Sequence, residues 1–125
     1  MTHGGLTGLV EGAITQPHDL VLSTERMNQI EEVSPLERTI TAQAGVVLQT
    51  LQETAANAGL MFPLDLGGRG SCTIGGNIST NAGGNRVIRY GMMRDMVLGL
   101  EAVLADGTVI SVSYTHLTLP TKRIV

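Results

Sequence analysis

The segment S-C-T-I-G-G-N-I-S-T-N-A-G-G-N, residues 71–85, constrains this chain more than any other feature. It holds four glycines, three asparagines and four hydroxyl residues without a single charge. A solvated loop normally carries charge, and a core strand rarely tolerates so much glycine. Glycine lets a ligand approach the backbone closely, while amides and hydroxyls supply hydrogen-bond donors and acceptors. The segment therefore indicates a backbone shaped to lie against a large, polar, uncharged part of a bound cofactor.

A second glycine loop, G-G-L-T-G, occupies Gly4 to Gly8. Successive backbone N–H groups in such a loop can form a concave nest for phosphate oxygens, and the Thr7 hydroxyl can add a donor. A simple tight turn is the alternative interpretation. The loop lacks the lysine of the G-x-x-x-x-G-K-[ST] phosphate loop, and it does not match G-x-G-x-x-G after a strand.

Composition excludes several function classes. The 125 residues allow one domain or part of one, and 42% hydrophobic residues are enough for a core. A net charge of -3 without a basic run, and only three aromatic residues, argue against nucleic-acid binding. The three histidines have no metal-ligand spacing, so no metal site is expected. No carboxylate pair or Ser-His couple suited to hydrolysis is evident.

The single cysteine, Cys72, excludes an internal disulfide framework and favours a reducing compartment. No run of residues is apolar enough to span a bilayer, and no signal peptide precedes the first glycine loop. We therefore expect a soluble, cytoplasmic protein.

Local patterns predict a mixed α+β domain. The clearest helix spans residues 46–58, where apolar residues recur at helical spacing and Gly59 provides the stop. A helical turn is expected at residues 25–29. No strand is expected before the first glycine loop, and His3 is interpreted as a loop residue. Strands are predicted at residues 19–23, 29–33, 38–44 and 97–104, the last followed by a hairpin turn at 105–108 that leads to 109–110.

Both ends of the chain differ from an ordinary domain. Glycine stops after Gly107, and the only lysine is Lys122. The final stretch resembles a peptide that recurs at the ends of unrelated predicted proteins and derives from sequencing-adaptor DNA. We therefore expect residues 112–125 to be a non-native tail and residues 1–111 to be a partial domain, incomplete at both ends.

Several motifs in fixed order resemble one family. They are H-G-G-L-T-G-L, V-L-S-T-E-R-M-N, A-G-V-V-L-Q-T-L-Q, F-P-L-D-L-G-G-R-G-S-C-T-I-G-G-N-I-S-T-N-A-G-G-N and R-Y-G-M-M-R-D-M-V-L-G-L-E-A-V-L-A-D-G-T. This order is similar to that of the FAD-linked oxidoreductases of the vanillyl-alcohol oxidase type, in particular the 2-hydroxyacid branch of D-lactate dehydrogenase, glycolate oxidase subunit and D-2-hydroxyglutarate dehydrogenase. The resemblance covers residues 3–111.

The resemblance implies a PCMH-type FAD-binding domain of two small α+β subdomains. It implies hydride transfer from a 2-hydroxyacid carbon to flavin N5, with the electrons passing to a separate acceptor. The first loop would hold the FAD pyrophosphate, and the later segments would follow the ribityl chain and flavin. The implied cofactor-binding residues are Gly4, Gly5, Leu6, Thr7, Gly8, Pro63, Asp65, Ser71, Cys72, Gly75, Gly76, Asn77, Thr80, Asn81 and Ala82.

Departures from the family pattern refine this expectation. Some relatives bind FAD covalently through a histidine just after the paired glycines, but Leu6 stands there, so non-covalent FAD is expected. Cys72 is interpreted as a small packed residue. Arg69, Arg86, Arg89 and Arg94 are interpreted as surface residues. The substrate-binding cap of the family has no counterpart before residue 111, so no catalytic residue is assigned.

Two alternatives remain open from the sequence. The chain could be a non-catalytic flavin- or nucleotide-binding module, or a defective fragment without activity. It could also be a relative that acts on an aldonolactone or a cell-wall sugar nucleotide, although the C-T-I-G-G-N-I-S-T-N-A-G-G form argues against this.

Overall fold

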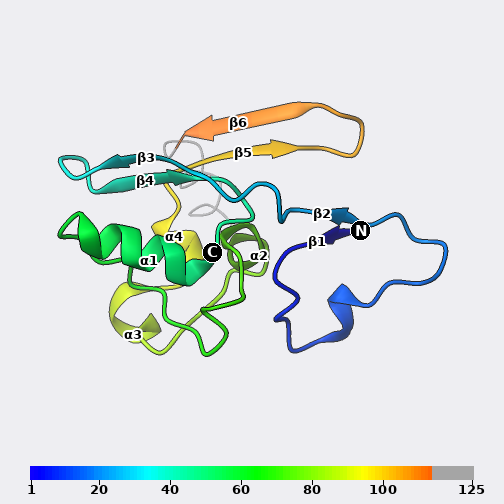
Figure 1. Ribbon diagram of the computed structural model, residues 1–125, viewed down its shortest axis with the longest axis horizontal. Helices are drawn as coiled ribbons and strands as arrows, with labels where there is room; N and C mark the ends of the chain where they lie inside the picture. The colour runs from blue at the N-terminus through cyan, green and yellow to red at the C-terminus, as the bar shows by residue number, and fades with distance from the viewer. Residues whose placement is uncertain (114–125) are drawn as a thin grey trace, which may run out of the picture.

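A computed structural model describes residues 1–113 (Figure 1). Strands occupy the first part and the end of this region, and four α-helices lie between them, so the α+β prediction is confirmed. In order, the elements are β1 (Thr2–His3), the 3-10 helix η1 (Glu11–Ala13), β2 (Leu22–Ser23), β3 (Ile30–Ser34), β4 (Thr39–Ala42), α1 (Leu48–Asn57), α2 (Ile74–Ser79), α3 (Val87–Tyr90), α4 (Met93–Met96), β5 (Gly99–Val103) and β6 (Val109–Ser113).

The described strands form three separate two-stranded sheets. β1 and β2 are parallel, with Thr2 opposite Leu22 and His3 opposite Ser23. β3 and β4 are antiparallel, as are β5 and β6. None of the helices within residues 1–113 is long and apolar enough to cross a membrane.

The core lies where α1 packs beside the β3–β4 hairpin (Figure 1). Leu48, Leu51 and Ala55 fall on one face of α1 and are at most 4% exposed, as the helical periodicity predicts. Gly59 has φ +74° just after the helix, so the predicted stop is confirmed. The buried cluster consists of Val46, Leu48, Leu51, Leu64, Cys72, Ile74 and Met93.

Helix α2 was not expected from the sequence, because Gly75 and Gly76 oppose helix formation. Tertiary hydrogen bonds fix its first turn: the N–H groups of Ile74 and Gly75 donate to the carbonyls of Val46 (2.9 Å) and Ala44 (2.7 Å). A Cβ at Gly75 would lie 2.8 Å from the Ala44 Cβ, so this close pairing requires glycine. Packing thus overrides local propensity.

Two predictions about the first third of the chain are wrong. The loop at Gly4 does follow a strand, because β1 pairs with β2, and His3 is therefore a strand residue. Residues 25–29 form a turn without a helix. There the carbonyls of Met27 and Gln29 accept hydrogen bonds from the N–H groups of Gly45 (2.7 Å) and Gln43 (3.0 Å), which holds this stretch extended. The strand predicted at residues 19–23 is shorter, only β2.

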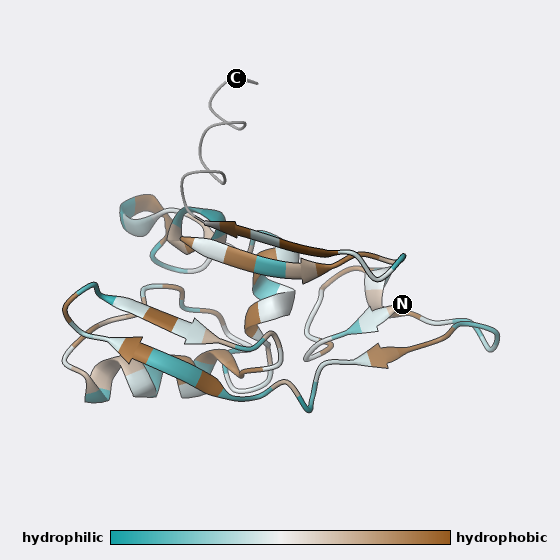
Figure 2. Ribbon diagram, turned by 90° about the horizontal axis from the view of Figure 1, so that it is seen from above, coloured by the Kyte–Doolittle hydropathy of each residue, from teal (hydrophilic) through white to brown (hydrophobic). Residues whose placement is uncertain are grey.

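The predicted hairpin at the end of the domain is confirmed by β5, β6 and the turn between them. The Thr108 backbone N–H donates to the Asp106 carboxylate at 2.9 Å, and this bond lowers the pKa of that carboxyl. Figure 2 shows hydrophobic residues along both strands. Of the predicted tail, Val112 and Ser113 pair with Leu100 and Gly99; residues 114–125 lie outside the described part.

Candidate functional site

The platform of the site is a short antiparallel pairing between the residues that precede α1 and those that precede α2. Val47 and Thr73 form an isolated β-bridge. The Leu48 N–H donates to the Cys72 carbonyl (3.0 Å), and the Ile74 N–H donates to the Val46 carbonyl (2.9 Å). These hydrogen bonds anchor residues 71–76 to the core, so that their other side can meet a different part of the chain.

The first glycine loop lies directly on this platform. A Cβ at Gly4 would stand 2.5 Å from the Thr73 Oγ1, and one at Gly5 would fall well under 3.0 Å from the Ser71 carbonyl oxygen. Farther along the loop, the Thr7 side chain lies 3.5 Å from the Cβ position of Gly68. The fold therefore brings together two glycine motifs that lie more than sixty residues apart in sequence.

The backbone N–H groups of the first loop are available to a ligand. Within residues 1–113, no protein acceptor takes the N–H of any residue from Gly4 to Gly8. Leu6 adopts the left-handed conformation, with φ +53°, which costs an ordinary side chain about 1–2 kcal/mol. Alternation of right- and left-handed residues turns successive N–H groups toward one point. The loop thus combines free N–H groups with one left-handed residue, two features of an anion-binding nest.

A buried hydroxyl without a partner faces the same loop. Thr73 is 7% exposed, and its Oγ1 has no hydrogen-bond partner within the described residues. The glycines Gly4 and Gly76 border it: Cβ atoms there would lie 2.5 and 3.4 Å from this oxygen. The His3 Nε2 is also buried and without a partner in this part of the chain. Unpaired buried polar atoms cost free energy, so their retention is typical of a ligand site.

Thr73 was absent from the predicted cofactor-binding residues, although it lies within the 71–77 stretch from which Ser71, Cys72, Gly75, Gly76 and Asn77 were named. The only feature of the sequence that pointed to Thr73 was its hydroxyl group within the uncharged 71–85 segment. Nothing in the local pattern showed that this hydroxyl would be buried, because its burial depends on the bridge to Val47.

The predicted residues at the end of α2 have structural partners. The Thr80 hydroxyl donates to the Gly76 carbonyl (2.9 Å) within the helix. Asn81 has φ +49°, and its Oδ1 accepts the Arg94 N–H (2.9 Å) at the start of α4. The Ala82 carbonyl accepts the Met93 N–H (2.9 Å). These contacts join α2 to α4 and set the direction in which the chain leaves the platform.

Pro63 and Asp65 belong to the half-buried segment that leads into the platform. The Asp65 carboxylate pairs with Arg69 at 3.4 Å, and its carbonyl accepts the Asn85 N–H at 3.1 Å. Gly84 crosses so close to this carbonyl that a Cβ would fall under 3.0 Å from it. These contacts tie the end of the uncharged segment to the stretch of chain that precedes it.

The side chains of Cys72 and Asn77 are buried beneath the platform backbone. Cys72 is 3% exposed within the core, as expected for a small packed residue. Asn77 is 4% exposed, and its Nδ2 donates to the Cys72 Sγ at 3.6 Å. In the described part of the chain, no three His, Cys, Asp or Glu residues gather as metal ligands. The site offers hydrogen bonds and close backbone approach, which serve to bind and orient a molecule.

Sequence comparison agrees with this geometry. The model of the family described as "FAD binding domain" matches residues 1–113. The chain is 50% identical over 108 residues to the mitochondrial D-2-hydroxyglutarate dehydrogenase of Bos taurus, covering 86% of the chain and 20% of that protein. It is 47% identical over 110 residues to D-2-hydroxyglutarate dehydrogenase of Xanthomonas citri pv. viticola, covering 88% and 23%.

A putative mitochondrial D-lactate dehydrogenase of Schizosaccharomyces pombe is 46% identical over 107 residues, covering 86% of the chain and 20% of that protein. The chain thus spans about a fifth of the length of these relatives. A solved structure of alkyldihydroxyacetonephosphate synthase matches 98% of the chain and 23% of its own length, with a TM-score of 0.78 and 23% identity, which shows a shared fold. The match to the family model over residues 1–113 establishes that this chain belongs to the FAD-binding domain family.

Proposed function

We propose that this chain is the FAD-binding portion of a flavin-dependent 2-hydroxyacid dehydrogenase. The identity of 46–50% to D-2-hydroxyglutarate and D-lactate dehydrogenases is the observation that supports this most directly. Bound FAD would supply the acceptor for the hydride of the substrate carbon, and a separate acceptor would take the electrons onward. The protein residues described above bind and orient this cofactor.

The residues present fit FAD. The free N–H groups from Gly4 to Gly8 suit the pyrophosphate, which needs several donors converging on its oxygens. The unpaired Thr73 hydroxyl, together with the exposed Ser71 and half-buried Gly76, suits the neutral polyol and ring portions of the cofactor. Pro63, Asp65 and the 80–82 segment are assigned supporting positions along the same path.

The direct test is to purify the chain and record its flavin spectrum. We expect a bound-flavin absorption band, and saturable quenching of added FAD. A folded, colourless protein that does not bind added FAD would contradict the proposal and favour a defective fragment. The substrate arm uses the full-length gene product: anaerobic bleaching of its flavin by D-2-hydroxyglutarate or D-lactate supports the dehydrogenase, and bound flavin that neither acid bleaches supports a non-catalytic module.

Replacing Thr73 by Val tests the orientation of FAD at the platform. Val has nearly the same shape but no hydroxyl, so the protein without cofactor should be as stable as the wild type, or up to about 1–3 kcal/mol more stable. FAD affinity should fall about tenfold, through the loss of one buried hydrogen bond. Urea unfolding and FAD titration measure the two effects. Equal FAD affinity in the two proteins would remove Thr73 from the site.

The cofactor should be held non-covalently. No histidine or cysteine lies within Gly4 to Gly8, and the Cys72 thiol is buried under the platform. Precipitation with trichloroacetic acid should therefore release all flavin into the supernatant. Flavin that stays with the pellet would show a covalent link, and peptide mapping would then locate it.

A reducing compartment agrees with a single buried cysteine. We accordingly place the protein in the cytoplasm as part of this proposal, and cell fractionation would test it.

A further inference from the structure

Outside the glycine loops, one cavity gathers positive charge. It has a volume of about 350 Å³ and is lined by Met61, Asn85, Arg86, Ile88, Arg89 and Tyr90. None of these six described residues is acidic. We propose that this cavity, on the α3 side of the domain, binds a small anion that carries a carboxylate or phosphate group.

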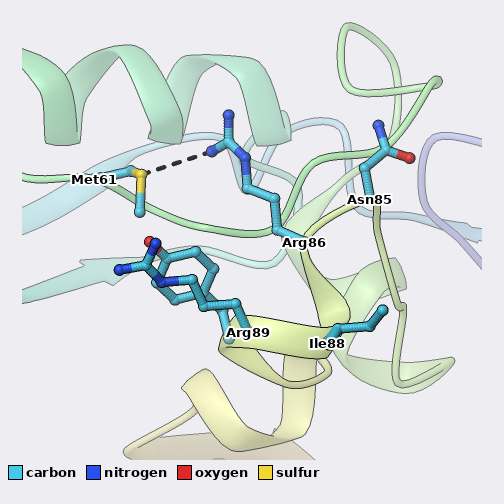
Figure 3. Close-up of a pocket in the computed structure, with 6 residues that line it drawn as sticks. Met61, Asn85, Arg86, Ile88 and Arg89 are labelled. Carbon is cyan, nitrogen blue, oxygen red and sulfur yellow. Dashed lines mark hydrogen bonds between the residues drawn. The ribbon is translucent and has the colours of Figure 1, made fainter.

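Two arginine side chains line the cavity. Figure 3 shows Arg86 and Arg89 extending from the α3 region toward Met61, whereas Ile88 and Asn85 extend away from them. Two positive charges that line one cavity repel each other, and an anion bound beside them offsets this repulsion. Guanidinium groups also present paired N–H donors that match carboxylate and phosphate oxygens.

Neighbouring groups hold both arginine side chains without neutralising them. The Arg89 guanidinium carbon lies 5.2 Å from the centroid of the Tyr90 ring, a cation–π distance. The Arg86 Nη1 lies 3.6 Å from the Met61 Sδ, a weak acceptor. Within residues 1–113, the one ion pair joins Arg69 to Asp65, so no carboxylate is paired with Arg86 or Arg89. Their remaining N–H donors are available to a ligand.

A second cavity of about 150 Å³ continues this site. It shares Met61 and Arg86 with the first, and it reaches the Arg69–Asp65 pair beside α1. The combined surface presents three arginines and one carboxylate on a protein whose net charge is -3. Its size suits a small metabolite, since ligand pockets begin at about 300 Å³. A ligand with two acidic groups could engage both cavities at once.

The experiment uses the full chain saturated with FAD, in a buffer without competing anions, with inorganic phosphate and succinate as separate probes. Amide NMR shifts for residues 85–90 should saturate with at least one probe, and the probe that binds identifies phosphate or carboxylate as the preferred group. Perturbation confined to Gly4–Gly8, or no saturable shift with either probe, would overturn the proposal. Shifts confined to Gly4–Gly8 report on the cofactor site, whereas shifts at residues 85–90 report on the anion cavity. The experiment therefore distinguishes a failure of the anion proposal from a failure of FAD binding.

Variants give a second readout. Arg86→Gln and Arg89→Gln should each weaken binding about tenfold, the value of one charge-assisted interaction. Arg89→Lys keeps the charge but loses the planar fork, and should weaken binding less. Arg26→Gln is the matched control, because it removes an exposed arginine outside both cavities. Equal weakening in the control would show nonspecific charge attraction and overturn the assignment. Circular dichroism verifies that each variant remains folded.

Discussion

Gly5→Ala should abolish FAD binding and lower the free energy of unfolding by about 3 kcal/mol. The added Cβ would fall well under 3.0 Å from the Ser71 carbonyl oxygen and 2.9 Å from the Cys72 Cα. Both atoms belong to the backbone of the platform, which hydrogen bonds fix to the residues before α1. Neither can move aside, so the loop must lift away and its N–H groups lose their position. Urea unfolding and FAD titration measure the two effects.

Gly12→Ala is the matched control for this variant. A Cβ at Gly12 meets nothing within 4 Å, so the same chemical change should leave both stability and FAD affinity close to wild type. If Gly5→Ala bound FAD as tightly as Gly12→Ala, the contact between the two glycine motifs would not be needed for the cofactor.

Leu48→Ala should lower the free energy of unfolding by about 2–5 kcal/mol, which can exceed the whole stability of a small domain. Leu48 is 0% exposed and begins α1, where the helix meets the platform. Removing its side chain leaves a cavity among Val46, Leu51 and Ile74, and these neighbours hold the platform residues in place. Thermal or urea unfolding followed by circular dichroism measures the loss.

The matched control is Leu36→Ala, at a residue 93% exposed in the β3–β4 turn. It deletes the same atoms and should change stability by no more than about 0.5 kcal/mol. If both variants lost a similar amount of unfolding free energy, the burial of Leu48 would not be the cause of the loss.

Local sequence patterns were sufficient for elements whose hydrogen bonds close within a few residues. Helix α1 follows from apolar spacing and Gly59, and the β5–β6 hairpin follows from its turn residues. Strands β3 and β4 lie within two or three residues of the predicted segments. The order of the glycine motifs was also enough to indicate the family, because each motif is specific only in combination with the others.

Elements stabilised by distant partners could not be predicted in this way. β1 exists because Thr2 and His3 pair with a strand twenty residues away. Helix α2 forms despite its two glycines because the Val46 and Ala44 carbonyls accept its first two N–H groups. The extended conformation of residues 27–29 likewise depends on the chain beyond β4. Each of these hydrogen bonds closes a long loop, so no short window of sequence contains both partners.

The sequence alone determined that this protein has an uncharged, glycine-rich surface suited to a large cofactor, since residue types fix the available donors, acceptors and charges. Tertiary structure decided which of these groups are left available to a ligand. It placed Gly4 and Gly5 on the Ser71–Thr73 backbone, buried Thr73 without a partner, and gave the amide of Asn81 to α4 instead. It also brought Arg86 and Arg89 to one cavity. The physical reason is that direction and burial depend on contacts between distant segments, and these exist only once the chain has folded.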